Sequence, residues 1–142
     1  MITLQQKELV KKTWVMVVPI ADTAAELFYG RLFELQPAYR SMFKNDMTEQ
    51  GKKLMKTINI AVESLDDLES LIPTLKQMGA DHAGYGVKDR DYSVVGASLL
   101  WTLKKGLGEA FTDEVMNAWG AVYDVLATVM KEGAAESSEA AA

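Results

Sequence analysis

Residues 78–87 read MGADHAGYGV, and His82 within this stretch is the only histidine in a chain of 142 residues. It continues an apolar stripe whose members recur every three or four residues, as one face of an α-helix requires. The stripe consists of Leu71, Leu75, Met78, His82 and Tyr85. Gly84 and Gly86 predict the end of this helix. The spacing therefore puts one imidazole on the apolar face of a helix, close to its C-terminal end.

Helical patterns also fill the sequence on both sides of this stretch. The expected helices cover residues 4–18, 20–35, 37–43, 48–65, 71–84, 89–107 and 112–130. Thr3 and Gln6 match a capping box, and Pro19 predicts the end of the first helix. The residues expected to cap later helices are Thr48, Asp89 and Thr112. No strand pattern, internal repeat or linker competes with these helices, so we predict a single all-α domain.

The composition excludes several classes of protein. A net charge of −5 argues against nucleic acid or an anionic membrane as the main partner, because phosphate binding needs a basic face. No signal peptide is recognisable, and no stretch approaches the roughly 18 apolar residues of a membrane span. Because cysteine is absent, disulfides are excluded and a reducing, cytoplasmic location is expected. The domain is expected to cover residues 1–132, followed by a disordered tail at 133–142 that lacks large apolar residues.

Two interpretations of His82 follow from its position. It is either a satisfied core residue or a functional group, meaning a metal ligand or a catalytic base. A catalytic triad has weak support because neither a G-x-S-x-G motif nor a cysteine occurs. Zinc would need further nitrogen or sulfur ligands, which the sequence lacks. Haem iron needs only one histidine because the porphyrin supplies the equatorial ligands. The sequence position alone leaves both interpretations open.

Two further polar residues lie on apolar helix faces. Gln50 shares a face with Leu54 and Ile58 at intervals of four residues. Tyr29 lies on one side of its helix with apolar neighbours, which are Ala25, Leu32 and Phe33. Gln50 is otherwise an ordinary solvated residue of a first helical turn, and Tyr29 an ordinary core aromatic. Together with His82, however, they describe a pocket with one iron ligand and two hydrogen-bond donors.

With these residues in this order, the chain resembles the globin family, specifically the bacterial single-domain haemoglobins related to flavohaemoglobin haem domains. The resemblance spans about residues 4–130 and rests on the order and spacing of five segments. These are ELFYGRLFELQPAYRSMF (26–43), TEQGKKLMKTI (48–58), LIPTLKQMGADHAGYGV (71–87), DYSVVGASLLWTLKKGLGEAFTDEV (91–115) and AWGAVYDVLATVM (118–130). The resemblance implies a globin fold, a haem b (iron protoporphyrin IX) cofactor, and His82 as its proximal iron ligand.

The resemblance also implies roles for other positions. Tyr29 matches the tyrosine whose hydroxyl approaches bound O2, and Gln50 matches the distal gate position. Both would stabilise the bound gas. Phe43 matches the aromatic residue that packs on the porphyrin face, and Tyr92 matches the proximal tyrosine near the ligand histidine. The remaining expected haem contacts are Leu54, Val87, Val95 and Lys53, of which Lys53 is equally well read as a solvated lysine.

One position departs from the flavohaemoglobin pattern. In that family an acidic residue of the last helix completes a hydrogen-bonded chain from the proximal histidine through the tyrosine. Here the matching position falls near Ala134, and Glu132 lies about two residues out of register. Such a carboxylate makes the imidazole more basic and pushes electrons toward the iron. Its absence argues against peroxidase-like chemistry.

The implied function is reversible binding of O2, with CO and NO as further ligands. The alternative is an enzyme, a nitric oxide dioxygenase that yields nitrate and depends on a separate reductase, because no flavin or nicotinamide domain is present in the sequence. A gas sensor is the weaker third candidate, because no output domain is recognisable. A helical bundle without haem would follow only if the resemblance misleads. The sequence leaves the oligomeric state, the O2 affinity and the identity of the reductase open.

Overall fold

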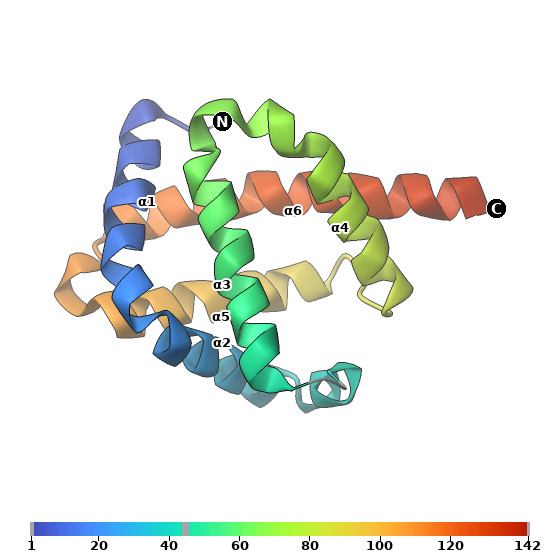
Figure 1. Cartoon of the computed structure of the whole chain (residues 1–142), viewed down its shortest axis with the longest axis horizontal. Helices are drawn as coiled ribbons and strands as arrows, with labels where there is room; N and C mark the ends of the chain where they lie inside the picture. Colours follow the sequence, from blue (N-terminus) through green and yellow to red (C-terminus); the bar gives the residue numbers. More distant parts are fainter. Residues whose placement is uncertain (1, 44–45, 142) are drawn as a thin grey trace.

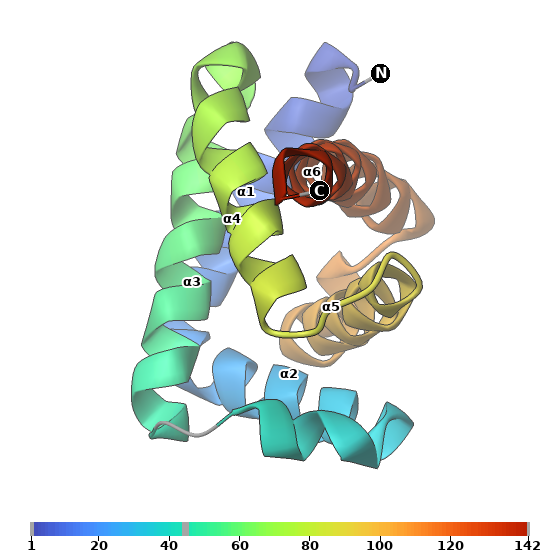
Figure 2. The same cartoon turned by 90° about the vertical axis from the view of Figure 1, so that its right-hand side faces the viewer.

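The computed structural model describes residues 2–43 and 46–141, with side chains through residue 137, and its regular elements are all helical. The α-helices are α1 (Leu4–Val17), α2 (Ala21–Leu35), α3 (Met47–Glu63), α4 (Ile72–Gly84), α5 (Asp91–Leu107) and α6 (Asp113–Ala141) (Figure 1). Short 3-10 helices join them: η1 (Val18–Ile20), η2 (Pro37–Met42), η3 (Leu65–Leu71) and η4 (Gly108–Ala110). In Figure 2, α3 and α4 stand upright while α5 and α6 are seen nearly end-on, so the two pairs cross. The prediction of an all-α fold is confirmed.

Several predicted helix boundaries are confirmed by their local chemistry. The backbone N–H of Gln6 donates to the Thr3 hydroxyl at 3.0 Å, and the Thr3 N–H donates to Gln6 Oε1 at 3.0 Å, which completes the capping box. Helix α1 ends at Val17, two residues before Pro19. At the start of α6, the N–H of Val115 donates to Thr112 Oγ1 at 3.2 Å.

Two predicted caps are wrong. The N-cap of α3 is Asp46, whose carboxylate accepts a hydrogen bond from the Thr48 N–H at 3.0 Å, so Thr48 is the capped residue. The N-cap of α5 is Arg90, and Asp89 makes no capping bond there. Instead the carboxylate of Asp91 accepts from the Lys88 N–H at 2.8 Å. In both places another aspartate near the predicted residue has the geometry that closes the turn.

The main core lies where α1 and α6 meet, and two tryptophans join the elements around it. The indole N–H of Trp119 on α6 donates to Thr13 Oγ1 on α1 at 2.9 Å. The indole N–H of Trp14 donates to Asn59 Oδ1 on α3 at 2.8 Å. The two rings pack with centroids 6.0 Å apart, and all their polar atoms are thereby satisfied inside an apolar cluster.

Helix α6 is longer than predicted and runs beside α4. It continues through Ala141, past residue 133, where the composition predicted a disordered tail; residue 142 lies outside the described residues. Gly133 is buried against α4, and Lys76 Nζ lies 2.8 Å from the Glu136 carboxylate. Alanine and glutamate favour helix, and these contacts give the extension a surface to pack on. Figure 1 shows α6 running past α4 toward the C-terminus.

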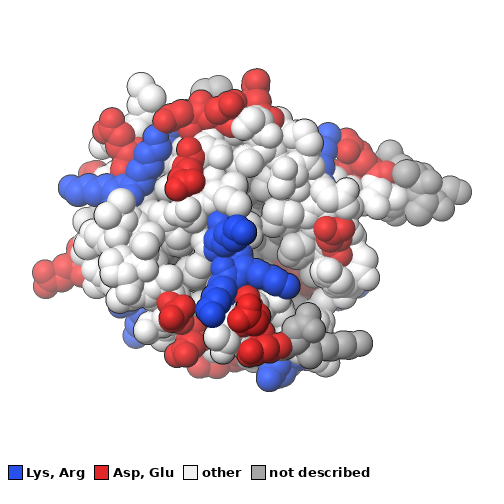
Figure 3. Space-filling model, in the orientation of Figure 1, with Lys and Arg blue, Asp and Glu red and all other residues white. Residues whose placement is uncertain are grey.

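The face of the molecule shown in Figure 3 carries charges of both signs. On this face, several lysine and arginine side chains lie together near the centre and others lie toward the edges, among acidic and uncharged side chains. A broad basic face of the kind that phosphate binding needs is not present in that view. Among the helices described, none combines the length and the apolar character that crossing a membrane would require.

Candidate functional site

A group of aromatic and aliphatic side chains gathers around Tyr29 between α2, η2, α3 and α5. We call it the Tyr29 cluster, and its members are Phe28, Tyr29, Leu32, Phe33, Tyr39, Phe43, Met47, Leu54, Val94, Val95 and Leu99. The Phe43 ring lies edge-on to the Tyr29 ring with centroids 5.3 Å apart, and 5.5 Å from the Phe33 ring. The structure thus brings together four of the predicted site residues, which are Tyr29, Phe43, Leu54 and Val95.

Gln50 reaches this cluster from the first turn of α3. Its side-chain N–H donates to the Tyr29 hydroxyl oxygen at 3.3 Å. Because the hydroxyl oxygen accepts this bond, its own hydrogen stays available to another acceptor. Burial raises the pKa of Tyr29, and the bond from Gln50 opposes that rise only in part. The hydroxyl therefore stays protonated, and the pair offers two N–H or O–H donors in an apolar setting.

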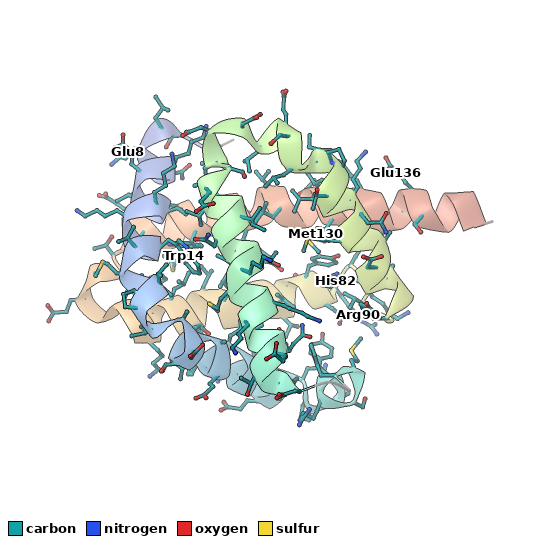
Figure 4. The ribbon with its side chains drawn as sticks, viewed as in Figure 1. Glu8, Trp14, His82, Arg90, Met130 and Glu136 are labelled. Carbon is teal, nitrogen blue, oxygen red and sulfur yellow. The ribbon has the colours of Figure 1, made fainter. Side chains whose placement is uncertain are left out.

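His82 lies on α4, outside the Tyr29 cluster, and its ring is held by its own helix. Its Nδ1 lies 2.6 Å from the backbone oxygen of Met78, one turn earlier. A carbonyl oxygen only accepts, so Nδ1 must carry the hydrogen and Nε2 of the neutral ring keeps a free lone pair. The Tyr85 ring packs near it with centroids 6.4 Å apart and is itself 72% exposed. Figure 4 shows His82 on the same side of α4 as Met130 of α6.

Tyr92 on α5 is buried and has an unused polar atom. Its hydroxyl meets no hydrogen-bond partner among the described residues. Its backbone oxygen accepts a bond of 2.6 Å from the Tyr123 hydroxyl, and Gly96 leaves the space that the Tyr123 ring fills. Burial raises the pKa of Tyr92, so this hydroxyl also stays protonated.

The acidic partner of the flavohaemoglobin pattern does not reach Tyr92 in this structure. The group that packs on the Tyr92 ring is the Lys131 ammonium, 5.5 Å from the ring centroid. Glu132 is exposed, and Ala134 is half-buried further along α6. The structure therefore agrees with the departure expected from the sequence at this position.

The remaining predicted contacts lie outside the Tyr29 cluster. Val87 is half-buried in the turn after α4, where its N–H donates to the His82 backbone oxygen at 3.0 Å. Lys53 is exposed on α3. Neither residue belongs to the Tyr29 cluster.

Sequence reasoning missed two residues that shape this region. The Tyr39 hydroxyl donates to the Asp91 carboxylate, which ties η2 to the first turn of α5. Burial and this hydrogen bond raise the pKa of Tyr39 to about 12. Tyr123 is the second missed residue. The two partners in each pair are far apart in sequence, so no local pattern could have revealed either contact.

The described residues fit a haem group. The only histidine keeps Nε2 free for a metal, and the Tyr29 cluster supplies apolar and aromatic surface. Tyr92 Oη is a buried hydroxyl without a protein partner. Within the described residues, no group of three histidine, cysteine, aspartate or glutamate side chains could hold a metal by itself. A single-histidine site therefore suits a metal whose other ligands come with a cofactor.

Comparison with known proteins agrees with this assignment. The globin family model matches residues 26–130. A neuroglobin from Tetraodon nigroviridis is 32% identical, with 95% of this chain and 94% of that protein aligned. The flavohemoprotein of Bacillus subtilis is 34% identical over 84% of this chain but only 31% of its own length, so this chain spans about a third of it.

Solved structures give the same result. An engineered carbene transferase from Rhodothermus marinus, itself named a "putative nitric oxide dioxygenase", superposes with a TM-score of 0.86 at 26% identity, covering 96% of this chain and 95% of that one. A bacterial globin from Campylobacter jejuni has the same fold, with a TM-score of 0.83 at 24% identity over 94% of this chain and 97% of its own. The sequence relatives and the superposed folds lead to one conclusion. The chain belongs to the globin family, for which haem is the implied cofactor, and it is related to the haem domains of flavohaemoglobins.

Proposed function

We propose that this chain binds haem b through His82 Nε2 and uses it for reversible binding of O2 and other diatomic gases in the cytoplasm. Haem supplies a ferrous centre with a coordination position open to a gas molecule. The observation that carries the proposal is the bond from His82 Nδ1 to the Met78 carbonyl, because in the neutral ring it places the hydrogen on Nδ1 and leaves the Nε2 lone pair for a metal. A metal-binding histidine commonly uses its second nitrogen in this way, and the bond orients the ring.

The chain's other residues prepare the space for a gas ligand. Tyr29 and Gln50 offer donors to a ligand that carries partial negative charge, and such charge-assisted bonds are the stronger kind. Phe43, Leu54 and Val95 belong to the apolar cluster that would keep water away from the cofactor. Val87 and Lys53 are proposed as contacts at the cofactor's edge, in keeping with their positions outside the cluster.

The test replaces His82 by glycine and supplies free imidazole. Wild-type protein reconstituted with haem should give a ferrous spectrum that changes reversibly with O2 and CO. His82→Gly should bind haem weakly, and imidazole should restore both the binding and the spectrum. Tyr85→Phe, which changes an exposed ring beside His82, is the matched control and should behave as wild type. A His82→Gly protein with wild-type haem affinity and spectrum in the absence of imidazole would overturn the assignment.

A second function, nitric oxide dioxygenation, has specific support. The structural relative from Rhodothermus marinus is described as a "putative nitric oxide dioxygenase". The flavohemoprotein of Bacillus subtilis aligns with 84% of this chain. In this reaction NO and O2 combine with one electron to give nitrate, so turnover needs a reductase as partner. Stopped-flow mixing of the oxygenated protein with NO, followed by nitrate measurement under a reductant system, distinguishes the two functions. Sustained nitrate production supports the enzyme, whereas a single oxidation without re-reduction supports gas binding alone.

A further inference from the structure

Helices α4 and α6 touch backbone to backbone, and two glycines make this possible. A Cβ atom added to Gly79 would lie 1.8 Å from the Met130 backbone oxygen, and one added to Gly133 would lie 2.1 Å from the Lys76 backbone oxygen. Both glycines are buried. The obstructing atoms are backbone, which cannot rotate away as a side chain can. Each helix therefore presents a glycine to the backbone of the other.

The two contacts are reciprocal and sit one turn apart on each helix. Lys76 precedes Gly79 by three residues on α4, and Met130 precedes Gly133 by three residues on α6. Residues at this spacing lie on the same helix face. Sliding α4 along α6 by one residue would bring a side chain, such as that of Met78, into a space that admits only hydrogen. The contacts at Gly79 and Gly133 thus fix both the distance between α4 and α6 and their register along one another.

This crossing lies next to the anchor of the His82 ring. The imidazole donates to the carbonyl of Met78, the residue directly before Gly79. His82 itself is one turn further along the same face. Restoring an ordinary contact of 3.4 Å at Gly79→Ala would require α4 or α6 to move by about 1.6 Å. Such a movement would shift the backbone to which the ring is bonded.

We infer that Gly79 and Gly133 are positioning residues that hold α4, and with it His82, at a fixed place on α6. This inference rests on the proposed function in one respect, the role of His82 as the haem ligand. A side-chain contact at the outer edge reinforces the crossing, since Lys76 Nζ lies 2.8 Å from the Glu136 carboxylate. The segment 130–136 of α6 is therefore part of the proximal side of the site.

The experiment compares Gly79→Ala and Gly133→Ala with two matched controls. Gly84 on α4 and Gly120 on α6 are helical glycines at which an added Cβ meets nothing within 4 Å. The readouts are the rate of haem loss to an acceptor protein and the iron–histidine stretching frequency of the ferrous form. Disturbing groups that orient a metal ligand commonly costs 10- to 100-fold in metal affinity. We expect haem loss to be about 10- to 100-fold faster and the stretching band shifted or broadened in both test variants, with both controls like wild type.

Three results would overturn the inference. In the first, both test variants fold and keep the wild-type rate and frequency. In the second, the controls change as much as the test variants. In the third, the test variants melt at lower temperature while the haem readouts stay unchanged, which would mean a purely structural role. Should Gly79→Ala fail to fold, Gly133→Ala probes the same crossing at the end of α6, where the helix can separate from α4 without disturbing the core around Trp119.

A measurement on the haem-free protein separates this inference from the proposed function. Hydrogen exchange of the α4 amides should be faster in Gly79→Ala and Gly133→Ala than in wild type, and unchanged in Gly120→Ala. Unchanged exchange in the test variants would refute the crossing itself. A wild-type protein that never binds haem would refute the proposed function. The hydrogen-exchange result would still test the contact between α4 and α6.

Discussion

Removing the Tyr29 hydroxyl tests the proposed gas site most directly. Tyr29→Phe keeps the ring, and with it the packing against Phe28 and Phe43 at centroid distances of 5.0 and 5.3 Å. It removes one buried donor and the acceptor of the Gln50 bond. That bond is long, at 3.3 Å, and Gln50 is only half-buried, so water can replace the lost partner. The free energy of unfolding should therefore fall by no more than about 1 kcal/mol.

The effect on O2 should be much larger than the effect on stability. A hydrogen bond to a charged group contributes about 1.5–3 kcal/mol, and each 1.4 kcal/mol corresponds to a factor of about ten. The O2 dissociation rate of Tyr29→Phe should therefore rise roughly 10- to 150-fold, whereas the CO dissociation rate should change far less because bound CO is less polarised. Stopped-flow displacement of O2 by CO measures the first rate, and replacement of CO by NO measures the second.

Two outcomes would refute this reasoning. An O2 dissociation rate within about twofold of wild type would show that the Tyr29 hydroxyl does not donate to the ligand, because even a weak neutral bond is worth more than that. Equal increases for O2 and CO would indicate a change in access or packing rather than a lost hydrogen bond. Tyr85→Phe removes a hydroxyl from an exposed ring and should leave both rates unchanged.

Three further perturbations probe the fold around the site. Thr3→Ala removes the side-chain half of the capping box and should lower the free energy of unfolding by about 1 kcal/mol in urea titrations, with no change in the haem spectrum. The Tyr39 pKa is raised from 10.0 to about 12, so the folded state holds this proton more tightly; its contribution to stability is complete below pH 10 and is lost as the pH rises toward 12. Tyr39→Phe should therefore lose less stability than wild type over that interval, as urea midpoints at each pH would record, and parallel curves would contradict the assignment. Gly96→Ala puts a methyl group 2.7 Å from the Tyr123 ring and should destabilise by about 1–3 kcal/mol, whereas Gly120→Ala, which meets nothing, should be neutral or stabilising.

Most of the fold was predictable from the helical spacing of apolar residues, because this spacing indicates which face of each helix is buried. The stripe through Leu75 and His82 and the capping box at Thr3 are local patterns, and the structure has helices at both. The failures at Thr48 and Asp89 have a common cause. Several polar residues near a helix start are chemically able to cap it, so the residue type alone does not fix the boundary. The N-cap is Asp46 in one case and Arg90, without a side-chain capping bond, in the other.

The site was predictable only in the parts that lie in recognisable sequence patterns. Tyr29, Gln50 and Phe43 come from three separate elements. The helix faces suggested that Tyr29 and Gln50 line one pocket, whereas only the resemblance to globins added Phe43. The bond between Tyr39 and Asp91 and the crossing at Gly79 and Gly133 had no local signal. Both depend on how distant segments approach one another, which a periodicity does not encode. Helix α6 continues past residue 133, and small residues such as Gly133 are compatible with a close helix contact as well as with disorder.

The close contact between α4 and α6 has a consequence for the order of events during protein synthesis. The chain is made from the N-terminus onward, and a domain generally folds as a unit. The helix that carries His82 is made well before Met130 and Gly133, the residues it rests against. A ribosome-bound chain that has been synthesised only through α5 contains His82 but lacks the α6 backbone against which α4 packs. With the proposed roles of His82, Gly79 and Gly133, we therefore expect secure binding of the cofactor only after the late part of α6 has left the ribosome.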